Sequence, residues 1–180
     1  MGAIKVRLVD SDLISNILKT LPRSSIAYEV TKVDNFKIVT SNVVENEVEV
    51  FLRKLNVDLS KDGRIILDLW KNIKSLLDVR ESVGDPSNLK GIGERSLVYL
   101  LKKEASNSKI VSNNRKDVLK ILKEEKMDGK LLETPFEFYE EVGKSWFKTK
   151  SDIVKFMILA NHDFQVRNKK YCGNILRYIY

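Results

Sequence analysis

The chain has 180 residues, enough for one domain with or without an appendage, and a net charge of +7. No apolar run approaches the roughly 20 residues that a transmembrane helix needs, so we expect no membrane segment. The only cysteine, Cys172, excludes an internal disulfide and is typical of a cytoplasmic protein. The only histidine, His162, argues against a zinc site or a histidine-activated nucleophile. A metal site here would be built from carboxylates, which favour Mg²⁺ or Mn²⁺.

Apolar residues follow strand and helix periodicities in turn along the chain. Residues 3–9 alternate as a strand, and Asp10-Ser-Asp12 then caps a helix that Pro22 ends. Thr134 is a cap signal followed by proline at the first position of another helix. The other predicted strands are 36–39 and 109–111, and the other predicted helices are 43–55, 61–80, 93–103, 114–125 and one from 151 onwards.

Strands separated by helices predict an α/β domain in which helices flank a central, mainly parallel sheet. The composition shifts near Gly143, after which acidic residues nearly vanish. Residues 144–180 contain eight lysines and arginines against two aspartates, interleaved with aromatic residues. We therefore expect a domain over residues 1–143 and a basic, aromatic-rich extension over residues 144–180.

Three acidic residues are predicted to lie where the carboxyl ends of parallel strands meet. Asp10 ends the first strand, Glu47 lies in the helix after the second, and Glu94 begins the helix after Gly91-Ile-Gly93. Ligands bind at this edge of open α/β sheets. Carboxylates that are brought together repel one another, and a divalent cation compensates them. Such a cluster could hold Mg²⁺ or Mn²⁺, polarise a phosphodiester and activate water.

Four segments, in this order and spacing, resemble the PIN-domain ribonucleases, and the resemblance covers roughly residues 4–140. They are Leu8-Val-Asp10-Ser, Thr40-Ser-Asn-Val-Val-Glu-Asn-Glu47-Val, Gly91-Ile-Gly-Glu94-Arg-Ser and Ile110-Val-Ser-Asn-Asn114-Arg. The resemblance implies a three-layer fold and metal-dependent cleavage of single-stranded or structured RNA, often by the toxin of a toxin–antitoxin pair. It also implies that Asp10, Glu47 and Glu94 are metal-site carboxylates.

The last segment departs from the family pattern, which has a hydroxyl residue, a variable residue and then an acid. Ser112 fits the hydroxyl position, but Asn114 stands where the acid is expected. An amide oxygen can ligate a cation but brings no charge. Asn113 is the neighbouring candidate, and Asp117, one turn into the next helix, could substitute. The alternative to a nuclease is therefore a catalytically weakened PIN-like module that binds nucleic acid or protein.

Each acid also has a structural interpretation. Asp10 and Glu94 could be helix caps, because the helix dipole favours acids at helix N-termini. Glu47 has Glu45 and Glu49 as rivals, any of which could lie on a solvated surface. A third interpretation is an unrelated α/β domain in which all the acids are caps and lie far apart. Asp12 is predicted to cap the first helix, and the alternative is a supporting role behind the metal ligands.

Basic residues supply candidate contacts to RNA, because cations neutralise phosphates and aromatic side chains can stack on unpaired bases. Two arginines flank the predicted site and could instead form surface ion pairs. The extension could likewise pack its aromatic residues on the core. RNA is the expected partner, and an antitoxin protein and a second copy of the chain are further candidates. The candidate RNA contacts are Arg95, Arg115, Lys148, Lys150, Arg167, Lys169 and Lys170.

Overall fold

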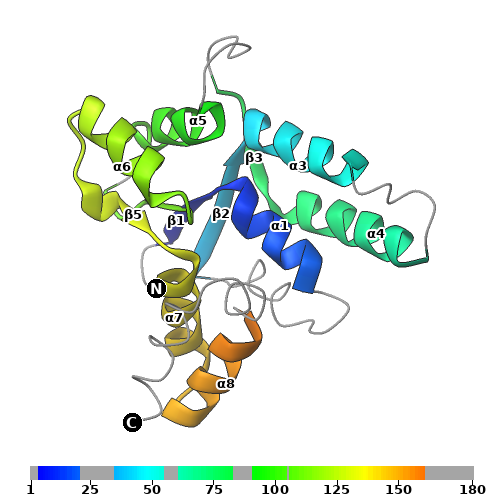
Figure 1. Ribbon diagram of the computed structural model, residues 1–180. Coiled ribbons are helices and arrows are strands. Elements are labelled where there is room, and N and C mark those ends of the chain that lie inside the picture. Colours follow the sequence, from blue (N-terminus) through cyan, green and yellow to red (C-terminus); the bar gives the residue numbers. More distant parts are fainter. Residues whose placement is uncertain (1–3, 21–34, 55–60, 83–90, 105, 161–180) are drawn as a thin grey trace.

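Strands alternate with helices along the chain in the computed structural model, which describes residues 4–20, 35–54, 61–82, 91–104 and 106–160 (Figure 1). Five strands form one sheet in the order β3-β2-β1-β4-β5, and every neighbouring pair is parallel. The predicted α/β class with a mainly parallel sheet is thus confirmed. The elements are β1 Lys5–Val9, α1 Ser11–Thr20, β2 Phe36–Ser41, α3 Asn42–Lys54, α4 Lys61–Leu76, β3 Asp78–Arg80, α5 Ile92–Leu101, β4 Lys109–Val111, α6 Arg115–Glu124, η3 Gly129–Leu131, β5 Leu132–Glu133, α7 Pro135–Trp146 and α8 Lys150–Ala160.

The three central strands form the middle of the core. Leu8 of β1 lies opposite Val39 of β2 on one side and Ile110 of β4 on the other. All three side chains are fully buried. A parallel sheet that is buried on both faces requires helices on both faces, and the crossover helices supply them.

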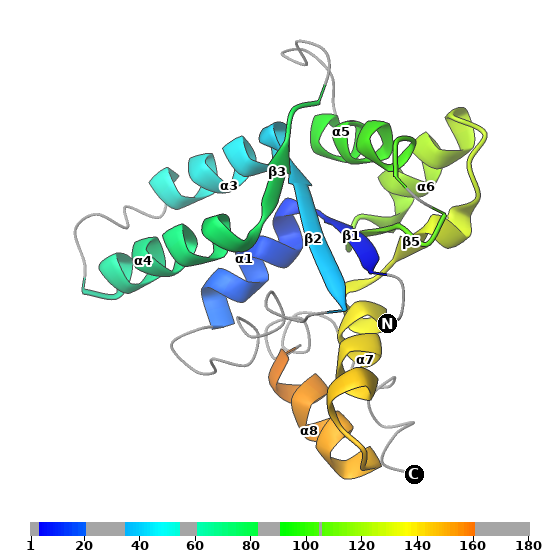
Figure 2. The same cartoon turned by 180° about the vertical axis from the view of Figure 1, so that it is seen from behind.

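The helices divide into two groups, with α1, α3 and α4 on one side and α5 and α6 on the other (Figures 1 and 2). This division follows from right-handed crossovers. The chain steps from β1 through β2 to β3 in one direction, and from β4 to β5 in the other. The direction reverses between the neighbouring strands β1 and β4. In open α/β sheets, ligands bind at such a switch point, beyond the carboxyl ends of the strands.

The α7–α8 pair lies beyond the amino ends of β1 and β2, away from that switch point (Figure 2). Thr134 accepts a hydrogen bond from the backbone N–H of Glu137, whose side chain accepts one from the backbone of Thr134. This capping box confirms the predicted start of α7. Phe138 then packs edge-on against Phe36 of β2, with ring centroids 5.7 Å apart. The expected domain boundary after Gly143 falls inside α7.

A buried ion-pair network joins β1 to β5 and α7. The Arg7 side chain is 2% exposed. It donates to Glu133 and, at 2.6 Å, to Glu141. Its guanidinium also lies 5.3 Å from the ring centroid of Phe36. Because a buried charge requires paired partners, this network fixes where α7 docks on the sheet.

Two strands differ from the sequence prediction. The predicted helix over residues 61–80 ends at Leu76, and its last residues form β3 beside β2. The sequence also did not predict β5, which pairs with β4. Each is an edge strand of two or three residues with one apolar side chain, too short to show a strand period. Pairing with a neighbour far along the chain decides their conformation.

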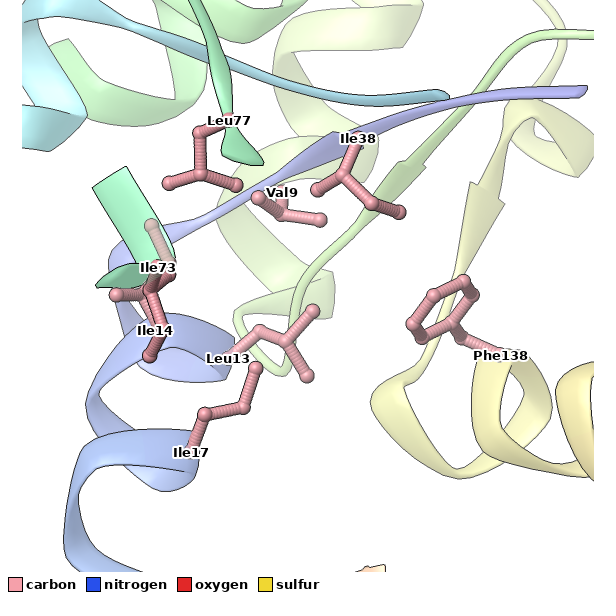
Figure 3. Close-up of a pocket in the computed structure, with 8 residues that line it drawn as sticks. All are labelled: Val9, Leu13, Ile14, Ile17, Ile38, Ile73, Leu77 and Phe138. Carbon is pink, nitrogen blue, oxygen red and sulfur yellow. The ribbon is translucent and has the colours of Figure 1, made fainter. Parts of the chain in front are cut away.

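The core contains a small apolar gap of about 10 Å³ (Figure 3). Its lining comes from β1, β2, α1, α4 and α7, including Ile73 of α4, and from Leu77, which follows α4. A gap of this size without polar groups does not hold an ordered water. Within the described ranges, no helix is both long enough and apolar enough to cross a lipid bilayer.

Candidate functional site

Asp10 lies at the switch point, where β1 ends beside β4. Its backbone N–H donates to the carbonyl of Val111 at 3.1 Å, which continues the ladder between the two strands. Its carboxylate accepts hydrogen bonds from the Ser112 hydroxyl at 2.6 Å and from the Ser11 backbone N–H at 2.8 Å. Only 5% of Asp10 is exposed. The sheet and these two donors therefore hold a nearly buried carboxylate in one place.

Glu94 enters the site from the first turn of α5. Gly91 precedes the helix with a φ of 78°, in the left-handed region that favours glycine. The Glu94 carboxylate accepts a hydrogen bond from the side-chain amide of Asn114 at 2.5 Å. Residues that follow β3 and β4 therefore meet at the same edge of the sheet.

Glu47 of α3 reaches the site next to the start of α5. Its carboxylate lies against Gly93, where a Cβ atom would be only 2.7 Å from Glu47 Oε1. It accepts hydrogen bonds from the Gly93 backbone and the Ser11 side chain. Glu45 and Glu49 instead bind Lys74 of α4. Of the three acids on α3, Glu47 is the one at the site.

The three carboxylates interact electrostatically. Burial raises the pKa of Asp10 above its ordinary value, and repulsion from Glu94 raises it further. Partial burial also raises the pKa of Glu47, and Asp10 and Glu94 add to the shift. Asp10, Glu47 and Glu94 therefore lie near enough to interact, so the interpretation in which these acids lie far apart does not hold, while their role as metal ligands stays a prediction.

Asp12 is a fourth acid at this edge. Burial, followed by repulsion from Asp10, raises its pKa to about 7. One carboxylate oxygen accepts a hydrogen bond from the Asn113 backbone at 2.6 Å, so Asp12 connects α1 to the loop after β4. The other oxygen, Oδ1, is buried and has no hydrogen-bond partner among the described residues. A supporting role of this kind is the alternative that the sequence left beside a helix cap.

Asn114 contacts Glu94 as a hydrogen-bond donor. Its amide nitrogen donates to Glu94 and, at 3.0 Å, to Asp117, and its backbone N–H donates to Ser112 Oγ. Asp117 thus reaches the site through Asn114. Asn113 contributes its backbone N–H to Asp12. In this arrangement Asn114 and Ser112 orient the carboxylates around them.

A buried pair of serines, which sequence reasoning missed, joins the two helices that carry Glu47 and Glu94. Ser41 Oγ and Ser96 Oγ are 2.6 Å apart, and Ser96 donates to the carbonyl of Gly93. Ser41 also accepts the backbone N–H of Val44 in the first turn of α3. The hydroxyls therefore fix the starts of α3 and α5 relative to each other. The only signal in the sequence is a small polar residue at a strand end.

The donor chemistry of the site suits a hard cation. Carboxylates that repel one another, together with the unpartnered oxygen of Asp12, are what Mg²⁺ or Mn²⁺ would compensate. Within the described ranges, however, no three acidic, histidine or cysteine side chains are arranged as a finished metal cluster. One reason is that the Glu94 carboxylate already accepts a hydrogen bond from the side-chain amide of Asn114. Metal binding at these residues would therefore require side-chain rotation.

The basic candidates lie in different places. Arg95 forms an ion pair with Glu124 at 3.0 Å, whereas Arg115 is exposed at the start of α6, next to the site. Lys148 and Lys150 lie where α7 leads into α8, at the opposite end of the sheet from the site (Figure 1). Arg167, Lys169 and Lys170 lie outside the described residues.

A comparison of the sequence with models of known protein families gave no match, and neither did a comparison with curated protein sequences.

Proposed function

We propose that this chain is a PIN-type endoribonuclease that cleaves RNA phosphodiester bonds with Mg²⁺ or Mn²⁺. The observation that carries the proposal is the convergence of Asp10, Glu47 and Glu94 at the switch point of the sheet. These are the acids that the PIN resemblance implies as metal ligands. A bound ion would polarise the phosphodiester and lower the pKa of a water nucleophile.

The chain's own residues hold the carboxylates in place. Ser112 donates to Asp10, and the backbone of Gly93 donates to Glu47. Asn114 donates to Glu94. Each acid comes from a different segment and has at least one donor of its own, so the fold brings the acids together before any ligand arrives, although a cation would have to displace the Asn114 amide from Glu94. An antitoxin partner and a cytoplasmic location belong to the same proposal, and they rest on sequence alone.

The proposal is tested with two variants that each remove one carboxylate charge. Asp10→Asn keeps the side-chain shape, and Glu45→Gln is the control, because Glu45 binds Lys74 on the far side of α3. We expect Asp10→Asn to lose Mn²⁺ binding, measured by calorimetry, and cleavage of labelled single-stranded RNA. Glu45→Gln should retain both. Wild-type protein without either property, or Asp10→Asn cleaving like wild type, would refute the proposal.

A second candidate function, a catalytically weakened binding module, is favoured by Asn114. Its amide brings no charge, and its nitrogen faces Glu94. Asn114→Asp separates the two functions, because they predict opposite changes in Mn²⁺ affinity and RNA cleavage. If the site is weakened for lack of an acid, the substitution raises Mn²⁺ affinity and cleavage. If Asn114 positions Glu94 in an active nuclease, the substitution lowers both, because a carboxylate cannot donate to Glu94.

A further inference from the structure

The two sides of the molecule carry different charge. Residues 91–131, which include α5 and α6, contain ten lysines and arginines against six acids. Residues 42–81, which include α3 and α4, contain seven against eight. These two groups of helices lie on opposite sides of the sheet (Figure 1), and the carboxylate site takes Glu47 from α3 and Glu94 from α5. Of the two sides, the α5–α6 side is the one with an excess of positive charge.

Two acids at the end of α6 form ion pairs with basic side chains of the α5 segment. Arg95 pairs with Glu124 at 3.0 Å, and Lys102 pairs with Glu125. On α6, the Lys120 side chain is 73% exposed, and its ammonium lies as far as 4.0 Å from Glu124, which also pairs with Arg95. Arg115, Lys116 and Lys123 are exposed, and none of them has a carboxylate within ion-pair distance among the residues that the structure describes. Three exposed cations of α6 therefore lack an acidic partner among the described residues, as do Lys103, Lys126 and Lys130, which lie outside the helix.

These cations form a row that begins at the carboxylate site. Arg115 and Lys116 follow Asn114, which contacts Glu94. Lys120 and Lys123 lie four and seven residues after Lys116, so they share one face of the helix and extend about 12 Å from its start. The opposite face is buried. We call Arg115, Lys116, Lys120 and Lys123 the α6 basic row.

Folding alone does not account for the start of this row. The helix dipole disfavours cations in the first turn, yet Arg115 and Lys116 occupy the first two positions of α6. An anionic backbone lying over this turn would offset that disadvantage. A polymer with regularly spaced phosphates fits a row of cations that leads directly away from a carboxylate site.

We propose that the α6 basic row is the path along which single-stranded RNA leaves the Asp10–Glu47–Glu94 site, with its phosphates on these four side chains. This inference rests on the proposed function for the position of the cleaved bond. It assigns the contacts to α6, rather than to Arg95 or to the lysines between α7 and α8.

The test measures binding of a fluorescent single-stranded oligouridine in EDTA at a series of salt concentrations. One variant carries Lys116→Gln, Lys120→Gln and Lys123→Gln. The control carries Arg53→Gln, Lys54→Gln and Lys71→Gln, three exposed cations of α3 and α4. Each phosphate contact on a single strand contributes about 0.7 to the salt slope, so the α6 variant should lose about 2. The control, with the same change in net charge, should keep its slope.

Equal loss of slope in both variants, no loss in the α6 variant, or no binding by the wild type overturns the proposal. So does an acidic polypeptide that competes as well as RNA, because the row would then recognise an acidic protein. Binding in EDTA needs neither metal nor cleavage. If the proposed nuclease activity is wrong, the Mn²⁺ and cleavage assays fail while the salt slopes of RNA binding behave as expected. If the proposed RNA path is wrong, the salt slopes differ from expectation while cleavage is retained.

Discussion

Gly93→Ala should separate the stability of the protein from its metal binding. Gly93 lies in the first turn of α5 and its φ is not positive, so the backbone accepts alanine. The new Cβ would lie 2.7 and 3.0 Å from the two carboxylate oxygens of Glu47. Real Cβ atoms essentially never approach so closely, so one group must move. The Glu47 carboxylate is the end of a flexible side chain, and it moves at lower cost than the helix.

Two opposing terms set the effect of Gly93→Ala on stability. Alanine gains up to about 1 kcal/mol over glycine in a helix. Displacing Glu47 loses its hydrogen bond from the Gly93 backbone, a net contribution of about 1 kcal/mol. The free energy of unfolding should therefore change by less than about 1 kcal/mol in either direction. The proposed metal binding has no such compensation, because the substitution would move a proposed ligand, Glu47, out of the site.

The assay compares Gly93→Ala, which displaces the Glu47 carboxylate, with Glu47→Gln, which removes its charge without a steric clash. Both should weaken Mn²⁺ binding, Gly93→Ala by roughly 10–100-fold, the usual effect of disturbing a residue that orients a metal ligand. Chemical denaturation measures stability on the same samples. The reasoning is wrong if Gly93→Ala binds Mn²⁺ like wild type, or if it unfolds more easily by about 3 kcal/mol or more.

Three further predictions concern the scaffold. Ile73→Ala, at the apolar gap, should lower the free energy of unfolding by about 2–5 kcal/mol. The control is Leu76→Ala on the same helix, where the leucine is 39% exposed and the loss should be under about 1 kcal/mol. Equal losses in urea titrations would contradict this. Burial raises the pKa of Glu141, but hydrogen bonds from the basic side chains of β1 outweigh it, so the folded pKa lies below 4.5. Wild type should therefore be more stable than Glu141→Gln above about pH 5.5, and denaturation at a series of pH values should show this advantage shrinking as pH falls through the folded pKa; a constant difference would be inconsistent. Arg7→Leu leaves Glu133 buried without its main partner and should cost about 3–5 kcal/mol, whereas adding Glu133→Leu should restore part of it; additive losses in the double variant would exclude coupling.

The central strands were predictable from sequence because their own residues determine them. Leu8, Val39 and Ile110 lie in apolar runs, and such runs between amphipathic helices indicate a buried parallel sheet. The edge strands β3 and β5 were not predictable. Val79 and Leu132 are their only apolar residues, and they become strands only because β2 and β4 offer free edges. That information lies in residues far along the chain.

The site divides in the same way. The order of Asp10, Glu47 and Glu94 along the chain, each near the end of a strand or the start of a helix, was enough to predict that they meet. The PIN resemblance favoured Glu47 over its neighbours on α3, and Glu47 is the acid of that helix that lies against Gly93. The sequence did not supply the partner of the other two acids, because Lys74, which engages Glu45 and Glu49, lies on another helix.

Asn114 alters the electrostatics of the whole edge of the sheet. A carboxylate at this position could only accept hydrogen bonds, and it would stand against both Glu94 and Asp117. The amide donates to both, so it supplies without a cation part of the compensation that a bound ion would give. The arrangement of Glu94 is therefore stable in the absence of metal. For the same reason, a cation that takes Glu94 as a ligand must first displace the amide. Asn114 thus keeps the acids of this site ordered without a bound ion.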